Sequence, residues 1–261
     1  MPPAAHRPGM DRPALHLAIA ACLLLAGCSV LGPDHTRQER AVEALADARE
    51  AVDATDGYRF DGDLRVVATA DGRTERVEIG MNGTVDATER RMHSTAVREG
   101  EAYESYLINR TAYRECGGPM GMDMWGVENV TADDWTAATP AARQLALLES
   151  GSVYYNGTRT LDGEEAVLLV GRPTTEALTK YRERRDRSLL GGPNVENAAV
   201  RVWLDTETHR PLRSAVRFEV SQGGNSASAT IDMRFADYDS DLSVDVPVIP
   251  DERTWGTGCP E

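Results

Sequence analysis

Residues 227–235 read Ala227-Ser228-Ala229-Thr230-Ile231-Asp232-Met233-Arg234-Phe235, a strict alternation of apolar and polar side chains. Successive side chains of a β-strand point to opposite faces, so this stretch predicts a strand with one apolar face and one wet face. A sheet built from such strands must cover its apolar face with another layer. The fold therefore consists of a sheet packed on helices or on a second sheet.

The same alternation recurs along the chain and is separated by turn signals. Asp71-Gly72, Glu99-Gly100 and Asp162-Gly163 are each typical of a tight reversal between two strands. The first strand begins near Tyr58, where apolar residues alternate with Arg and Asp as far as Val66. We expect the remaining strands at residues 73–86, 90–98, 101–109, 111–115, 152–161, 164–170, 198–204, 211–220 and 227–235.

Three stretches have helical periodicity instead. In residues 36–55, apolar side chains recur at a spacing of 3.6 residues, and Gly57 ends the helix. Residues 138–149 and a segment from Pro173 to about Leu189, capped by Thr174 or Thr175, predict two more. Residues 116–135 are rich in glycine and methionine and predict a long loop. The residues expected on the apolar face of the first helix are Ala41, Val42, Ala44, Leu45, Ala48, Ala51 and Val52.

Nine to eleven antiparallel strands with two or three helices define an α+β fold. The helices are too few to cover a flat sheet of this size. We therefore expect a curved sheet, an open half-barrel, with the helices on its concave face. Residues 36–261 form a single domain in this interpretation.

The N-terminus resembles an export signal. Arg7 and Arg12 precede an apolar run over residues 14–26, which is followed by Leu25-Ala26-Gly27-Cys28. A run of about 13 residues suits a signal peptide, whereas a membrane span needs about 20. The last four residues match the lipobox of bacterial and archaeal lipoproteins. Residues 1–27 are then a signal peptide, and residues 28–35 are a tether from the lipidated Cys28 to the domain.

Two alternatives for this segment stay open: an uncleaved anchor, or a secretory signal that ends in cysteine by chance. Met10 could also be the true start. In the lipoprotein interpretation the domain lies on the outer face of the cytoplasmic membrane. One lipid chain gives only marginal binding, so the anchor needs two chains or a further contact.

The chain is strongly acidic, with a formal net charge of −14. Removing residues 1–27 takes away two arginines and one aspartate, which leaves −15. Such a surface repels nucleic acid, so a nucleic-acid partner is excluded. The acidity marks either a ligand-facing patch or a solubilising surface of the kind halophiles use. Lys180 is the single lysine, and this bias together with the acidity points to a halophilic archaeon.

Two cysteines remain once Cys22 leaves with the signal and Cys28 carries lipid. Cys116 and Cys259 form an even pair outside the cell, which predicts a disulfide. Zinc is the alternative, but two cysteines without a neighbouring Cys or His pair make a poor site. Export would also make four Asn-x-Thr sequons available for N-glycosylation. These acceptors are Asn82, Asn109, Asn129 and Asn156.

The second half of the chain resembles a known superfamily. The resemblance is carried by Tyr154-Tyr155-Asn156-Gly157, by residues 161–170, by Val200-Arg201-Val202-Trp203-Leu204-Asp205 and by His209-Arg210-Pro211-Leu212-Arg213. These blocks resemble the lipoprotein-localisation-factor superfamily of LolA-like and LolB-like carriers and mycobacterial glycolipid-binding lipoproteins. Uncharacterised lipoproteins of haloarchaea are the most similar. The resemblance covers about residues 36–250 and is specific over about 150–220.

The resemblance implies an open half-barrel that holds acyl chains between sheet and helices. Each buried methylene of such a chain contributes about 0.8 kcal/mol. The chain departs from the carriers in having only three phenylalanines. The Met-x-Met-x-Met run in the predicted loop is either an adaptable apolar lid or a set of soft Cu(I) ligands. Our candidate cavity and lid residues are Met120, Met122, Met124, Trp125 and Trp203.

Two charged clusters have both a functional and a structural interpretation. Asp237, Asp239 and Asp241 imitate the start of a calcium loop, but Leu242 and Val248 stand where that loop needs Gly and Glu. A solvated strand end explains them equally. A run of arginines could bind a headgroup or form the charged outer face of a helix. These arginines are Arg182, Arg184, Arg185 and Arg187.

The sequence contains no nucleophile elbow, zinc-protease motif or phosphate loop. His35, His93 and His209 have no Ser or Cys partner at a recognisable spacing. We therefore expect no enzyme activity and no cofactor. The leading hypothesis is an anchored extracytoplasmic lipoprotein that binds a lipid or other apolar ligand. The alternative is a structural module with a filled core that binds an envelope protein.

Overall fold

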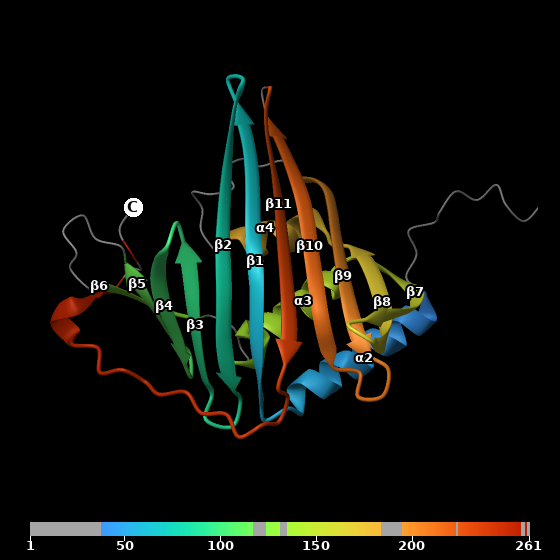
Figure 1. Cartoon of the computed structure of the whole chain (residues 1–261), viewed down its shortest axis with the longest axis horizontal. Helices are drawn as coiled ribbons and strands as arrows, with labels where there is room; N and C mark the ends of the chain where they lie inside the picture. Colours follow the sequence, from blue (N-terminus) through green and yellow to red (C-terminus); the bar gives the residue numbers. More distant parts are fainter. Residues whose placement is uncertain are drawn as a thin grey trace, which may run out of the picture. The chain divides into compact units, whose positions relative to one another are not determined.

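The structure, a computed structural model, describes residues 38–116, 124–130, 135–183, 195–222, 224–256 and 259. Residues Arg37–Glu261 form one compact unit. Within the described residues, twelve strands form one sheet (Figure 1). The strands are β1 (Gly57–Ala70), β2 (Arg73–Asp86), β3 (Arg91–Arg98), β4 (Glu101–Ile108), β5 (Thr111–Cys116), β6 (Met124–Asn129), β7 (Ser152–Leu161), β8 (Glu164–Arg172), β9 (Val195–Asp205), β10 (Pro211–Gln222), β11 (Asn225–Ala236) and β12 (Thr254–Trp255).

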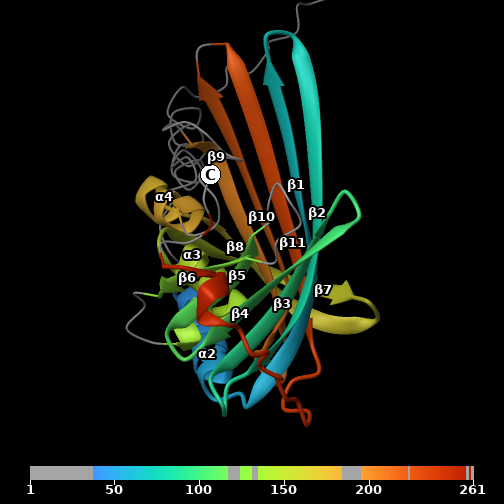
Figure 2. The same ribbon diagram turned by 90° about the vertical axis from the view of Figure 1, so that its left-hand side faces the viewer.

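The sheet is open. Its strand order is β12-β6-β5-β4-β3-β2-β1-β11-β10-β9-β8-β7, so β12 and β7 are its two edges and do not pair with each other. All neighbours are antiparallel except β12 and β6. The sheet bends toward the helices (Figure 2). The expected α+β fold with a curved antiparallel sheet is therefore confirmed, with one strand more than the predicted range.

The register of the central strands explains the alternation in the sequence. Phe60 of β1 lies opposite Phe235 of β11, and Leu64 lies opposite Ile231, with all four side chains buried. Asp61 and Arg234, which alternate with these residues, face each other on the opposite side of the sheet. One face is thus apolar and the other is wet.

Three helices of the described chain lie on the apolar side: α2 (Glu39–Asp53), α3 (Pro140–Glu149) and α4 (Thr175–Glu183) (Figures 1 and 2). This confirms the predicted helices on the concave face. In α2 the buried residues are Ala41, Leu45, Ala48 and Val52, but Val42 is 38% exposed. We had assigned Val42 to the apolar face. It lies one position after Ala41, which rotates its side chain about 100° away from the stripe.

Helix α3 is the centre of the packing between sheet and helices. Pro140 is at the first helical position, and Leu145 and Leu148 are completely buried against the sheet. The Ala141 backbone N–H donates a hydrogen bond of 3.1 Å to the Tyr58 hydroxyl of β1. This bond satisfies one of the N–H groups that a helix start leaves without a partner. None of the described helices is both long and apolar enough to cross a membrane.

The predicted loop over residues 116–135 is wrong in one part, because Met124–Asn129 form strand β6. Six residues of β6 pair with β5, from Thr111 opposite Asn129 to Cys116 opposite Met124. The strand forms because it pairs with the free edge of β5. This tertiary contact is not visible in the glycine-rich local sequence. The predicted disulfide joins Cys116 to Cys259 across a sequence separation of 143 residues.

Candidate ligand pocket

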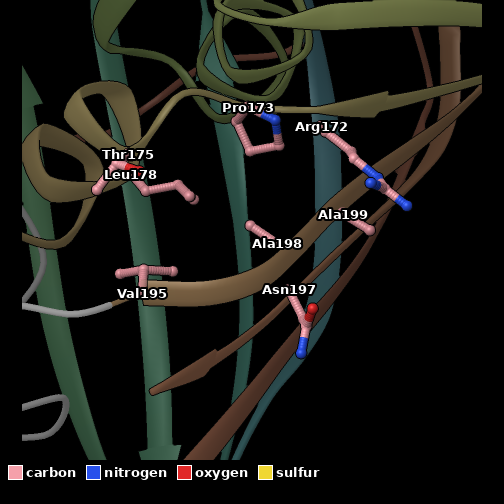
Figure 3. A pocket seen from close by; sticks show the side chains of 8 residues that line it. All are labelled: Arg172, Pro173, Thr175, Leu178, Val195, Asn197, Ala198 and Ala199. Carbon is pink, nitrogen blue, oxygen red and sulfur yellow. The ribbon is translucent and has the colours of Figure 1, made fainter. Parts of the chain in front are cut away.

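The candidate ligand pocket lies at a gap in the sheet between β8 and the start of β9. Strand β8 pairs with β9 only where residues 166–171 lie opposite residues 200–205. Among the described residues, no strand pairs with residues 195–199 on the β8 side. The chain leaves β8 at Arg172, turns at Pro173 and enters α4 next to this unpaired part of β9 (Figure 3).

A β-bulge lies beside the gap, on the side of β9 that pairs with β10. The pairing of β9 with β10 shifts register between Arg217 and Glu219, opposite Asn197 and Ala198. Asn197 has a φ of 50°, a left-handed conformation that asparagine tolerates better than most residues. The pocket has a volume of about 320 Å³. It is lined by Arg172, Pro173, Thr175, Leu178, Val195, Asn197, Ala198 and Ala199.

The two ends of the pocket differ in chemistry (Figure 3). Leu178, which is 2% exposed, projects from α4 above Val195 at one end. The exposed Arg172 lies at the other end, on the side of Ala199. Asn197 adds an amide, and every second residue of an unpaired strand edge turns its backbone groups toward the gap. The pocket is therefore amphipathic.

Local sequence positions the helix that closes the pocket. The Ala177 N–H donates to the Thr174 hydroxyl at 3.2 Å, so Thr174, one of the two predicted caps, is the N-cap of α4. The Thr174 cap and Pro173 together determine where α4 starts. This start places Leu178 one turn into α4 and over β9.

The candidate cavity residues lie elsewhere. Met124 and Trp125 are in β6, and seven strands separate β6 from β9 in the sheet. Met120 and Met122 lie outside the described residues. Neither Met124 nor Trp125 lines the pocket.

Trp203 lies on the outer face of the sheet, away from the helices. Its neighbours in β9, Val202 and Leu204, are fully buried on the inner face, so Trp203 points the other way. The Arg213 guanidinium lies 5.2 Å from the Trp203 ring and binds Asp232 through two hydrogen bonds of 2.9 and 2.5 Å. Trp203 therefore does not line the cavity, and our prediction for this residue is wrong. The alternation in the sequence predicts that the strand has two faces, but it does not show which face points toward the helices.

Trp125 belongs to a row of rings on the same outer face. His93 of β3 stacks on Tyr106 of β4 with 4.7 Å between ring centroids, and Tyr106 lies 5.8 Å from Trp125. Nε2 of His93 binds the Glu104 carboxylate, which also accepts a hydrogen bond from Thr95. The other described histidine, His209, lies in a turn with a φ of 58°.

The calcium-like aspartates are held by other groups. Asp239 accepts hydrogen bonds from the Thr55 hydroxyl (2.6 Å) and the Asp56 N–H (2.9 Å), and it pairs with Arg210. Asp237 pairs with Arg59 at 3.3 Å. Within the described part of the chain, no group of three or more His, Cys, Asp or Glu side chains could hold a metal ion.

The remaining predicted residues fall into two groups. The sequon asparagines Asn82, Asn109, Asn129 and Asn156 are all exposed. Cys28 and three of the four arginines in the predicted headgroup cluster, Arg184, Arg185 and Arg187, lie outside the described residues. Arg182 is the last but one residue of α4.

Sequence reasoning missed every residue that lines the pocket. Each residue type is ordinary in its element, and no motif marks them. The signal that could have found the site is the Arg172-Pro173 pair, where a strand must end and a helix begin. The bulge at Asn197 leaves no pattern in the sequence.

Comparisons with known proteins yield similar folds only. No family model matches the chain, and no curated protein matches it. Among solved structures, the fold is similar to lipoprotein LppX of Mycobacterium tuberculosis, at 13% identity over 79% of this chain and 98% of that chain, with a TM-score of 0.49. It is also similar to LprF of Mycobacterium bovis (12%, 81% and 99%, TM-score 0.43) and to a LolA superfamily protein of Nitrosomonas europaea (11%, 81% and 96%, TM-score 0.25).

Proposed function

We propose that this chain is a membrane-anchored extracytoplasmic lipoprotein that binds a lipid or other apolar ligand without catalysis. The observation that carries the proposal is the amphipathic pocket between α4 and β9. Its volume lies at the lower end of the range for ligand pockets, about 300–1,000 Å³. The lipobox that ends at Cys28 supports the membrane anchor.

Part of the pocket lining is suited to the apolar chain of a ligand. Val195, Ala198 and Ala199 offer aliphatic surface within a largely polar lining, and each methylene that a ligand buries there contributes about 0.8 kcal/mol. The alanines leave room that larger side chains would fill. The pocket accepts one chain end more readily than a whole two-chain lipid because of its modest volume.

Native mass spectrometry tests this function directly. The protein is purified in high salt from the membranes of its own cells and measured without delipidation. We expect a bound species whose mass is that of a lipid. A spectrum that contains only the apo mass would contradict the proposal.

A pocket-filling variant assigns the bound species to this pocket. Ala198→Phe places a ring in the pocket and is expected to reduce the lipid-bound fraction strongly. Ala102→Phe is the matched control, because Ala102 is an exposed strand alanine of β4. Both variants are first checked for a native circular dichroism spectrum. Equal loss of lipid in both variants would place the lipid elsewhere.

A second function is favoured by the row of rings on the outer face. Half-buried aromatic side chains such as Tyr106 and Trp125 are enriched where proteins bind one another. In this case the chain is an interaction module for an envelope protein. A clean apo mass together with a co-purifying protein would favour this alternative.

A further inference from the structure

We propose that the ligand of the α4–β9 pocket is an amphiphile with one apolar chain and an anionic head, and that Arg172 binds the head. The inference rests on the proposed function and adds the chemical class of the ligand. The single chain occupies the end formed by Leu178 and Val195. The head, a carboxylate or a phosphate, lies at the end formed by Arg172.

Arg172 is the charged side chain among the residues that line the pocket. Within the described residues, no carboxylate forms an ion pair with Arg172. Arg76 also forms no ion pair with a described carboxylate, but its side chain does not line the pocket. A guanidinium left unpaired at the rim of a pocket is suited to an anionic ligand.

Two carboxylates beside the pocket, those of Glu176 and Glu219, are engaged with other side chains. Glu176 in the first turn of α4 pairs with Lys180 at 2.7 Å. Glu219 accepts a hydrogen bond from Asn197 at 3.1 Å and pairs with Arg217 at 3.0 Å. Neither of these two carboxylates forms an ion pair with Arg172.

The charged Arg172 and several aliphatic side chains line the same pocket. An isolated arginine on the surface would attract any anion weakly. Here the aliphatic lining of Leu178, Val195 and Ala198 favours an anion that carries a chain. Backbone N–H groups on the unpaired edge of β9 offer further donors to the oxygens of the head.

Three probes with the same ten-carbon chain test the assignment: decanoate, decan-1-ol and decyltrimethylammonium. Binding to the mature chain carrying Cys28→Ser is measured by isothermal titration calorimetry, below the critical micelle concentration of the two ionic probes and below the aqueous solubility of decan-1-ol. We expect decanoate to bind about tenfold more tightly than decan-1-ol, and the cation to bind most weakly. Decyl phosphate, added as a fourth probe, distinguishes a phosphate head from a carboxylate head.

Two variants connect the preference to the residue. Arg172→Gln is expected to weaken decanoate binding about tenfold and to leave decan-1-ol binding within about twofold. Arg76→Gln is the control, because Arg76 is an exposed arginine of β2 outside the pocket. It is expected to change neither probe.

The outcomes separate this inference from the function on which it rests. If decanoate and decan-1-ol bind equally, and Arg172→Gln changes neither, the anionic head is disproved while apolar binding stands. If no probe binds, the ligand pocket itself is disproved. Inorganic phosphate competing with decanoate at equal concentration would show a plain anion site and also contradict the inference.

Discussion

The hydroxyl of Tyr58 in β1 connects the sheet to helix α3. The hydroxyl accepts the Ala141 N–H of α3, and the Tyr58 ring packs on Phe235 and Tyr238 with centroid distances of 5.9 and 5.4 Å. Burial raises the pKa of Tyr58 to about 12, since the phenolate is poorly solvated there. Burial likewise raises the pKa of Tyr238.

These shifts predict a loss of stability at alkaline pH. Between pH 10 and about 12 the folded state keeps the Tyr58 proton while the unfolded state releases it, so the free energy of unfolding falls as pH rises. For Tyr58 alone the fall is at most roughly 3 kcal/mol. Urea denaturation across this range measures it, and Tyr58→Phe is expected to flatten the curve. An unchanged curve in Tyr58→Phe, with Tyr113→Phe as control, would show that Tyr58 plays no part.

At the scale of elements, α3 packs on β8 where Gly171 leaves space. A Cβ at this position would lie 2.5 Å from Cδ1 of Leu148 and 2.8 Å from the Ser152 carbonyl oxygen. Neither distance is tolerated by real side chains. The absence of a side chain at Gly171 therefore sets how closely the helix approaches the sheet.

Gly171→Ala is expected to lower the free energy of unfolding by about 1–3 kcal/mol, because the helix or the strand must move. Gly80→Ala in β2 is the matched control, since nothing lies within 4 Å of the added Cβ. The control is expected to be neutral or slightly stabilising. Thermal unfolding of both variants compares them, and equal melting temperatures would contradict the packing argument.

How much the sequence predicts depends on whether a feature is local. The alternation in residues 227–235 gave β11 and its buried face, and Pro140 marked the start of α3. Strand β6 was missed because its partner β5 stabilises it. The pocket was missed because it arises where β8 stops before β9 does, and strand lengths relative to one another are a tertiary property. Trp203 was assigned to the wrong face for a similar reason.

At the scale of the whole molecule, the disulfide ties β5 to the C-terminal residues. Joining Cys116 to Cys259 restricts the unfolded chain, and the chain-entropy estimate for so long a loop is about 5 kcal/mol as an upper figure. The double variant Cys116→Ser/Cys259→Ser is therefore expected to unfold at clearly lower urea concentration. A midpoint equal to that of the parent would show that the crosslink does not stabilise the domain.

The proposed lipid anchor leads to a second prediction at this scale. Cys28→Ser removes the thiol that would carry the lipid, so the protein is expected to leave the membrane fraction. Immunoblots of fractionated cells check this, with Cys22→Ser as a control that keeps Cys28. Retention of Cys28→Ser in the membrane would favour the uncleaved anchor instead.

The central claim, that an apolar chain binds between α4 and β9, is tested most directly by photocrosslinking. A fatty acid with a diazirine near the end of its chain is bound to the protein and irradiated, and labelled peptides are mapped by mass spectrometry. We predict labels on Leu178 and on residues 195–199, and their loss in Ala198→Phe. Labels confined to the outer face, around Trp203 or Trp125, would contradict the account.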